Sequence, residues 1–363
     1  MTGIDDWRRD DTVVLSHVST SLAPSYAEYR ATSFELLDIL QVPVEQKKIT
    51  LKPNVVHGLA PDSGITVHPG FMRGVIDHFA ARGLDPTAIT IAEGGGGEDD
   101  RDMSVHFRAV EFDKLAAETG VRLVDLNADD FVRVDIPTGV VFKQMPIGRT
   151  VWDPEAYFIN IPKMRTHNLA ITTIAIKNLQ GIVVPVEERH MCTLFPRYDG
   201  DRGGDNLSGS VLDTHERWAH KIVDISLARK PDLNLVDGVI SRDGTGFRQG
   251  KNRALGIVLA GVNQASVDAV GTTLMGFDPH QITYVRVARE RGMGPIDLSE
   301  IRVLEARNGK LTERGSLHDL IADPPFRVTL SATINYQSWE PVDYAPAEVE
   351  MAHQASAFAP PDA

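Results

Sequence analysis

The sequence predicts an α/β fold in which a mostly parallel sheet is flanked by helices. Two observations support this fold class. Short apolar runs alternate along the chain with longer segments whose apolar residues recur at helical spacing. The resulting strand–helix–strand repetition is typical of parallel strands joined by helices that cover the sheet. The predicted strands are 11–18, 48–51, 88–92, 156–162, 233–240 and 254–261.

The helices are predicted between these strands, at 25–40, 69–83, 266–276 and in the first part of 112–127, where a glycine stop and a further strand follow. The second of them shows the signals most clearly, because Pro69 occupies its first turn and Gly83 ends it. The apolar segment 169–181 fits either a helix or an extended segment, and the sequence leaves both open.

The length of 363 residues allows one large domain or two of ordinary size. We predict an N-terminal α/β lobe at 1–150 and a C-terminal α/β lobe at 151–340 that continues from it, with the functional site between two such lobes as one arrangement. Residues 341–363 are rich in Ala and Pro without periodicity, which predicts a disordered tail. The polar, Gly- and Asp-rich segment 187–215 predicts a long loop or lid, and such loops usually have a function.

The net charge restricts the classes of molecule that the protein is expected to bind. Lys plus Arg total 37 against 50 for Asp plus Glu, a formal net charge of −13, which argues against a general binder of nucleic acid or of membrane surfaces. A small anionic metabolite remains a suitable partner, and a homo-oligomer is left open. The beginning of the chain lacks a signal-like apolar stretch and no later run has the length of a membrane span, so we expect a cytoplasmic protein.

The chain has one cysteine, Cys192. A single thiol excludes an internal disulfide framework and a zinc site of several thiolates. It also excludes an iron–sulfur cluster held by this chain alone. The cofactor is otherwise unknown from sequence, with a divalent metal as one option.

Polar residues recur where predicted strands end. In open α/β sheets, ligands bind outside the carboxyl ends of the strands, so these side chains are expected to build one polar pocket. The residues are Lys52 and Asn54 after the strand at 48–51, Glu93 after 88–92, Asn160, Lys163, Arg165 and His167 at or after 156–162, and Asp237 in 233–240.

The segment 160–168, NIPKMRTHN, is the most informative stretch of the chain. Its two cations suit a carboxylate or phosphate, and His167 suits proton transfer or metal binding. Lys177 and Asn178 follow within an apolar run, where a charge is costly without a partner and where a lysine can act as base or nucleophile. The alternative interpretation is a solvated loop whose cations pair with surface acids.

Three further groups have two interpretations each. His68 precedes Pro69 at a helix start, which suits an anion or metal ligand and equally a helix cap. Glu93 and Asp237 suit oxygen ligation of a divalent ion, and Asp237 equally suits a turn that caps backbone amides. Asp268 is expected to cap its own helix or to lie in the first turn of that helix.

The motifs in these segments resemble the domain of unknown function 362 family. They are LKPN at 51–54, HP at 68–69, AEG at 92–94, NIPKMRTH at 160–167, KNLQG at 177–181, VDGV at 236–239 and SVDAVGTTLMGFDP at 266–279. The resemblance singles out the same site residues as the strand ends do. It also implies a link to redox proteins, because many members carry ferredoxin-type cysteine segments or twin-arginine signals, and this sequence departs from both patterns.

We therefore expect an enzyme that acts on a small carboxylate- or phosphate-bearing metabolite by Lys/His acid–base chemistry of the isomerase or lyase type, with a divalent metal as an optional aid. The alternatives are a redox enzyme or accessory protein that works with a separate iron–sulfur or flavin partner, and a non-catalytic protein that binds a ligand or metal. The expected catalytic residues are His167, Lys177, Lys163 and His68, the substrate-binding residues are Lys52, Asn54, Arg165 and Asn178, and the metal ligands are Glu93 and Asp237.

Overall fold

The computed structural model describes residues 6–18, 21–43, 47–55, 58–95, 102–189, 211–246, 250–330 and 342–344. Its centre is a mixed, mostly parallel sheet with the strand order β13-β12-β1-β11-β10-β7-β2-β3-β4, to which β8 and β9 are attached beside β10. The strands are β1 (Thr12–His17), β2 (Lys48–Pro53), β3 (Ile89–Glu93), β4 (Arg122–Asp125), β7 (Ala156–Ile161), β8 (Lys163–His167), β9 (Ile171–Thr173), β10 (Leu233–Arg242), β11 (Asn252–Gly261), β12 (Arg302–Arg307) and β13 (Lys310–Glu313). The predicted α/β class is confirmed.

The five neighbours β10, β7, β2, β3 and β4 are all parallel, so their carboxyl ends lie at one edge of the sheet. The first strand, β1, lies between β11 and β12, antiparallel to the former and parallel to the latter. One sheet therefore runs through both predicted lobes, and β1 of the N-terminal half lies among strands of the C-terminal half.

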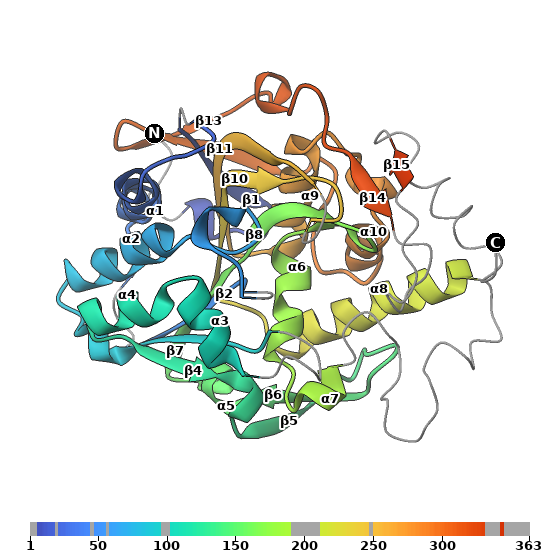
Figure 1. The fold of residues 1–363 in the computed structure, drawn as a ribbon. Coiled ribbons are helices and arrows are strands. Elements are labelled where there is room, and N and C mark those ends of the chain that lie inside the picture. Colours follow the sequence, from blue (N-terminus) through green and yellow to red (C-terminus); the bar gives the residue numbers. More distant parts are fainter. Residues whose placement is uncertain are drawn as a thin grey trace.

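Helices cover the two faces of this sheet (Figure 1). One face carries α1 (Tyr26–Leu40), α2 (Pro69–Ala80), α3 (Met103–Ala109) and α4 (Phe112–Thr119), and the other carries α6 (Ala175–Asn178), α8 (Val211–Ala228), α9 (Gln264–Leu274) and α10 (Thr283–Glu290). Buried apolar side chains of the strands pack against each layer, for example Ile49 with Leu37 and Phe71 on the first face and Leu259 with Val270 on the second.

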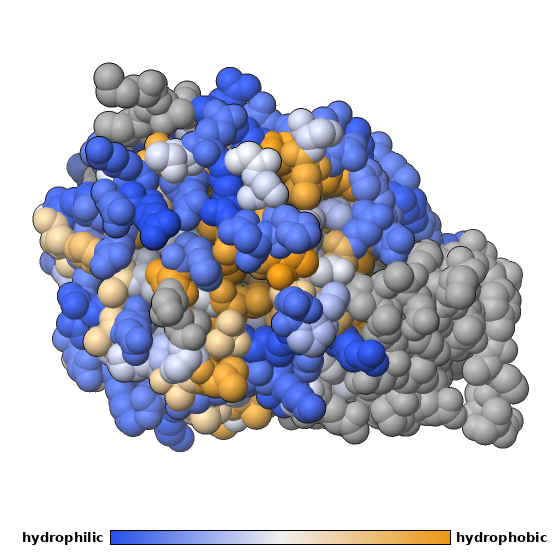
Figure 2. All heavy atoms as spheres, turned by 90° about the horizontal axis from the view of Figure 1, so that it is seen from above, coloured by the Kyte–Doolittle hydropathy of each residue, from blue (hydrophilic) through white to orange (hydrophobic). Residues whose placement is uncertain are grey.

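Smaller elements lie around the sheet. They are the two-stranded ribbon of β5 (Phe131–Asp135) and β6 (Gln144–Gly148), the pair β14 (Val328–Leu330) and β15 (Val342–Tyr344), and the short helices α5 (Arg149–Trp152) and α7 (Val186–Arg189). Hydrophilic residues cover most of the described surface in Figure 2, with apolar residues showing between them. The large exposed apolar side chains belong to different helices, strands and loops.

Three segments of the sequence analysis need a closer description. Residues 169–181 are neither one helix nor one strand, because β9, α6 and a 3₁₀ turn at Leu179–Ile182 follow one another there. Of the predicted loop 187–215, residues 190–210 lie outside the described part, and residues 211–215 already belong to α8. The predicted tail lies outside it too, apart from β15, which pairs with β14.

The packing of α1 against α2 depends on Gly74. A methyl group at this position would come within 2.1 Å of Ser33 Oγ and 2.2 Å of the Arg30 carbonyl oxygen, so only glycine allows the two helices this approach. We predict that Gly74→Ala lowers the free energy of unfolding by about 1–3 kcal/mol, as overpacking does. Gly315→Ala is the matched control, because nothing lies within 4 Å of its added methyl group. Urea denaturation checks both, and equal stabilities would contradict the prediction.

Candidate functional site

A chain of side-chain amides crosses the sheet close to the carboxyl ends of the central strands. Asn234 on β10 donates to the Gly261 carbonyl oxygen at 3.1 Å and accepts from Asn160 on β7 at 2.9 Å. Asn160 Oδ1 accepts from Asn178 of α6 at 2.7 Å, and Asn178 Oδ1 accepts from Lys52 Nζ on β2 at 3.4 Å. These bonds tie five elements together, namely β11, β10, β7, α6 and β2.

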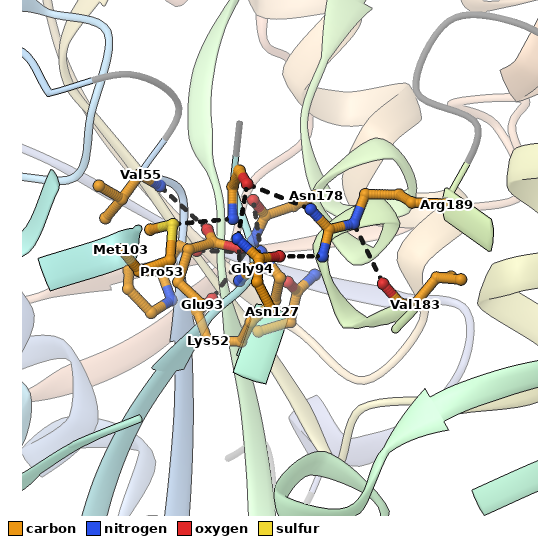
Figure 3. Close-up of polar contacts among 12 residues, drawn as sticks. Lys52, Pro53, Val55, Glu93, Gly94, Met103, Asn127, Asn178, Val183 and Arg189 are labelled. Carbon is orange, nitrogen blue, oxygen red and sulfur yellow. Dashed lines mark hydrogen bonds and ion pairs between the residues drawn. The ribbon is translucent and has the colours of Figure 1, made fainter. Parts of the chain in front are cut away.

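The chain of amides ends in a buried ion pair. Lys52 Nζ lies 2.7 Å from Glu93 Oε1, and the two side chains are 1% and 2% exposed (Figure 3). Glu93 also accepts from the backbone N–H groups of Gly94 at 2.9 Å and Val55 at 3.0 Å. Burial lowers the pKa of Lys52 and the adjacent carboxylate opposes this shift. Glu93 therefore connects β3, on which it lies, to β2 and to the segment that follows β2.

Arg189 completes this region, and the sequence analysis missed it. Its guanidinium donates to the carbonyl oxygens of Val183 at 3.1 Å and Gly95 at 3.2 Å, and to Asn127 Oδ1 at 2.7 Å. Its positive charge further lowers the pKa of Lys52. Arg189 belongs to α7 and follows no strand, so the strand-end criterion had no means of selecting it.

A second buried ion pair lies on the α1–α2 side. Lys163 Nζ is 2.8 Å from Asp237 Oδ2, the same atom accepts from the His68 backbone N–H at 3.2 Å, and both side chains are almost fully buried. Tyr29 of α1 lies beneath this pair, with Lys163 Nζ 5.7 Å from the centre of its ring. Burial lowers the pKa of Lys163 and Asp237 opposes this shift.

His68 is the N-cap of α2, as one of its two interpretations predicted. Its Nδ1 accepts from the Gly70 N–H at 3.0 Å, and its ring stacks on Tyr29 with centroids 3.8 Å apart. Burial, helped by the charge of Lys163, lowers the pKa of His68 to about 3. His68 is thus a neutral imidazole that starts a helix.

His167, at the end of β8, is also held as a neutral ring. Its Nδ1 accepts from the backbone N–H groups of Leu169 at 3.0 Å and Ala170 at 3.2 Å, which places the ring proton on Nε2. Burial, followed by the charges of Lys177 and Arg165, lowers its pKa well below the usual value. The neutral imidazole therefore carries its one N–H group on Nε2.

The two cations near His167 differ in their surroundings. Arg165 is 2% exposed, and its Nη1 donates to the carbonyl oxygens of Thr166 at 3.3 Å and Gly246 at 3.4 Å. Lys177 is partly exposed, and its Nζ lies 3.5 Å from Gln180 Oε1. Lys177 is therefore accessible from outside, while Arg165 is fixed inside the fold.

Two buried asparagines, Asn54 directly after β2 and Asn168 directly after His167, have unused hydrogen-bonding groups. Neither Oδ1 of Asn54 nor either polar atom of the Asn168 side chain has a hydrogen-bond partner in the described part of the chain. Asn54 is 6% and Asn168 1% exposed. A buried polar group left without a partner costs about 1–3 kcal/mol, so these positions call for a polar occupant such as water or a ligand.

The two side chains predicted as metal ligands, Glu93 and Asp237, lie apart in the structure, and their binding of a metal stays a prediction. Glu93 is on β3 and Asp237 on β10, three strand positions or about 14 Å apart in the sheet, and each carboxylate is bonded to its own lysine. Within the described ranges, no group of three or more His, Cys, Asp and Glu side chains is placed to hold a metal ion. The two carboxylates therefore stabilise lysines and do not form a shared ligand pair.

Asp268 has a role different from the one predicted. Asn263 caps α9, and Asp268 lies beyond the first turn of that helix, where it accepts from the N–H groups of Ala175 at 2.6 Å and Ile176 at 3.2 Å. It thereby caps α6, the helix that carries Lys177 and Asn178. Burial raises the pKa of Asp268 to about 7.

The fold and these motifs define a member of a known family. The family called domain of unknown function (DUF362) matches residues 49–273, more than half of the chain, so the protein belongs to this family. The chain is also similar to a thylakoid-associated protein of the cyanobacterium Synechocystis, with 25% identity over 278 residues that cover 73% of this chain and 76% of that protein. No described helix has both the length and the apolar character that a membrane crossing requires.

The first prediction from this site concerns the Lys52–Glu93 pair. Glu93→Gln leaves a buried ammonium group without its counter-charge, and we expect the free energy of unfolding to fall by about 3–5 kcal/mol. Glu188→Gln, which breaks the exposed pair with Arg133, is the matched control and should cost under about 1 kcal/mol. Adding Lys52→Met to Glu93→Gln should recover part of the loss. Denaturant melts that show equal, small effects for both glutamines would contradict the prediction.

The second prediction concerns the pH dependence of stability. The pKa of Asp268 is raised by folding, so the native state binds more protons than the unfolded state between about pH 4 and pH 7. The stability of the wild type relative to Asp268→Asn should therefore fall as the pH rises through this window. Urea denaturation of both proteins from pH 4 to pH 8 measures the difference, and parallel curves would refute the raised pKa.

Proposed function

We propose that the protein is an enzyme for a small anionic metabolite, and that it acts by proton transfer of the isomerase or lyase type at the carboxyl ends of β2, β7 and β8. The observation that carries this proposal is the unpartnered side-chain amide of buried Asn168, which directly follows the neutral imidazole of His167, together with the unpartnered Oδ1 of buried Asn54 after β2. A polar ligand would supply the hydrogen bonds that these amides lack, and strand ends of a parallel sheet are where such ligands bind.

Binding of the anion is assigned to Arg165, and Lys177 is the other basic side chain near His167. Both charges act on His167, which places them near the imidazole. A guanidinium offers two parallel N–H donors to a carboxylate or phosphate, and its position inside the fold would fix the orientation of the ligand. Lys52 and Asn178, predicted as substrate-binding residues, support this region through the chain of amides.

Proton transfer is assigned to Lys177 and His167. The Lys177 amine would remove a proton from the carbon next to a carbonyl or carboxyl group, and the electron pair of that C–H bond would move onto the oxygen. The Nε2–H group of His167 would donate to this oxygen as its negative charge develops. Return of the proton to carbon completes an isomerisation, and departure of a group from the next carbon completes an elimination.

Lys163 and His68 have a supporting part in this proposal. Lys163 is neutralised by Asp237, and the acceptor nitrogen of His68 is used by the Gly70 N–H. Both hold β8, β10 and the start of α2 together and neither is assigned a proton transfer. A cytoplasmic location stays a prediction, and the name of the cyanobacterial relative places only that relative at the thylakoid.

The test needs no knowledge of the product. The wild type is incubated in D₂O with a panel of small hydroxy- and oxo-carboxylates and sugar phosphates, and proton NMR follows the loss of the signal next to the carbonyl group. We expect exchange with at least one compound, and a fall of about 10²–10⁴-fold in Lys177→Met. His167→Asn keeps an acceptor for the two backbone N–H groups while it removes the Nε2–H donor, so it should fold normally and exchange slowly.

Lys310→Met, at an exposed position of β13, is the control for the loss of a lysine and should exchange at the wild-type rate. Binding of a compound without any exchange would favour a non-catalytic protein. Undiminished exchange in both Lys177→Met and His167→Asn would refute the assignment of these residues.

A further inference from the structure

A cleft lies at the opposite edge of the sheet from the candidate site. Its volume of about 480 Å³ falls in the range of small-molecule sites. It is formed by the first residues of β2, β4 and β7, by Thr90 of β3 and by α5 with the segment that follows it. These elements place it at the amino ends of the parallel strands, so it is independent of the site proposed above.

The basic side chains in this cleft differ in whether they have a carboxylate partner. Lys48 Nζ is neutralised by Asp153 at 3.0 Å and Glu155 at 3.1 Å. Arg122 and Arg149 also line the cleft, and neither forms an ion pair with any carboxylate in the described segments. In a chain of net charge −13, two guanidinium groups without carboxylate partners in one cleft favour an anionic occupant.

Further donors and one acid lie beside the two arginines. Thr90 is 2% exposed, and its Oγ1 accepts from Arg122 Nη2 at 2.8 Å, which leaves the hydroxyl proton to donate. Asp129 also lines the cleft, but its Oδ2 accepts from the Thr150 backbone N–H at 2.8 Å. The partly buried indole of Trp152 adds a flat apolar wall.

We propose that this cleft binds a phosphate monoester of a small metabolite. Arg122 and Arg149 present planar sets of N–H donors that match the geometry of phosphate oxygens, and Thr90 adds a hydroxyl donor. The indole of Trp152 stacks against an aromatic ring carried by the same ligand, as in a nucleoside monophosphate. The position of the cleft makes it a site for a second ligand, distinct from the substrate of the carboxyl edge.

Isothermal titration of the full-length protein with AMP and with inorganic phosphate tests this assignment. We expect both to bind, with AMP the tighter ligand. Arg122→Gln and Arg149→Gln should each weaken AMP binding at least about tenfold, the effect of losing a charged hydrogen bond. Arg289→Gln, which removes the same charge from a helix surface where Arg289 pairs with Glu300, should bind AMP as the wild type does.

Two further variants locate the ligand. Trp152→Leu should weaken AMP binding and leave phosphate binding unchanged, because only the aromatic ring meets the indole. Lys177→Met, at the other edge of the sheet, should bind AMP normally. The proposal is overturned if the wild type binds neither ligand at millimolar concentration, if both arginine variants bind AMP as tightly as the wild type, or if Lys177→Met abolishes the binding.

Discussion

The burial of Lys52 beside Glu93 is the constraint on which the centre of the structure depends. A lysine with 1% of its side chain exposed is tolerated only while a carboxylate and further hydrogen-bonding groups surround it. Because Glu93 also accepts two backbone N–H groups, the carboxylate cannot move away without leaving those donors unpaired. The chain of amides from Lys52 to Asn234 then extends this restraint to β7, α6 and β10. The carboxyl ends of the central strands are thus placed by polar bonds in addition to apolar packing.

The two histidines of this region share one arrangement with a chemical consequence. In both rings Nδ1 accepts backbone N–H groups and burial lowers the pKa, so neither ring carries a charge at neutral pH. The positive charge near His167 therefore resides on lysine and arginine and not on an imidazole. Under the proposed function, the Arg165 guanidinium would attract the anion and the Nε2–H group of His167 would donate to it.

The sequence predicted that these residues lie close to strand ends, but it did not predict which residues they contact. Strand ends singled out these residues, and the structure places Lys52 and Glu93 at the carboxyl ends of β2 and β3, Lys163 at the start of β8 directly after β7, and Asp237 inside β10. The pairing of Lys163 with Asp237 spans 74 residues, and it depends on β10 being the neighbour of β8, which periodicity along the chain does not encode. Arg189 and the capping of α6 by Asp268 were missed for the same reason, since both reach their partners from helices that pack onto the sheet.

The buried ion pairs and amides raise the question of why the fold keeps so many polar groups in its interior. An apolar set of similar volume is often as stable as a buried ion pair or more so, so the two lysine–carboxylate pairs are poorly explained by stability alone. The unpartnered atoms of Asn54 and Asn168 lower stability outright. Under the proposed function, a bound hydroxy acid would reverse this balance, because its carboxylate would accept from Asn168 Nδ2, its hydroxyl group would donate to an amide oxygen, and its charge would face the cations near His167. The energetic disadvantage of the unpartnered amides would then become affinity for the proposed ligand, which is the relation expected where polar side chains are preorganised for binding.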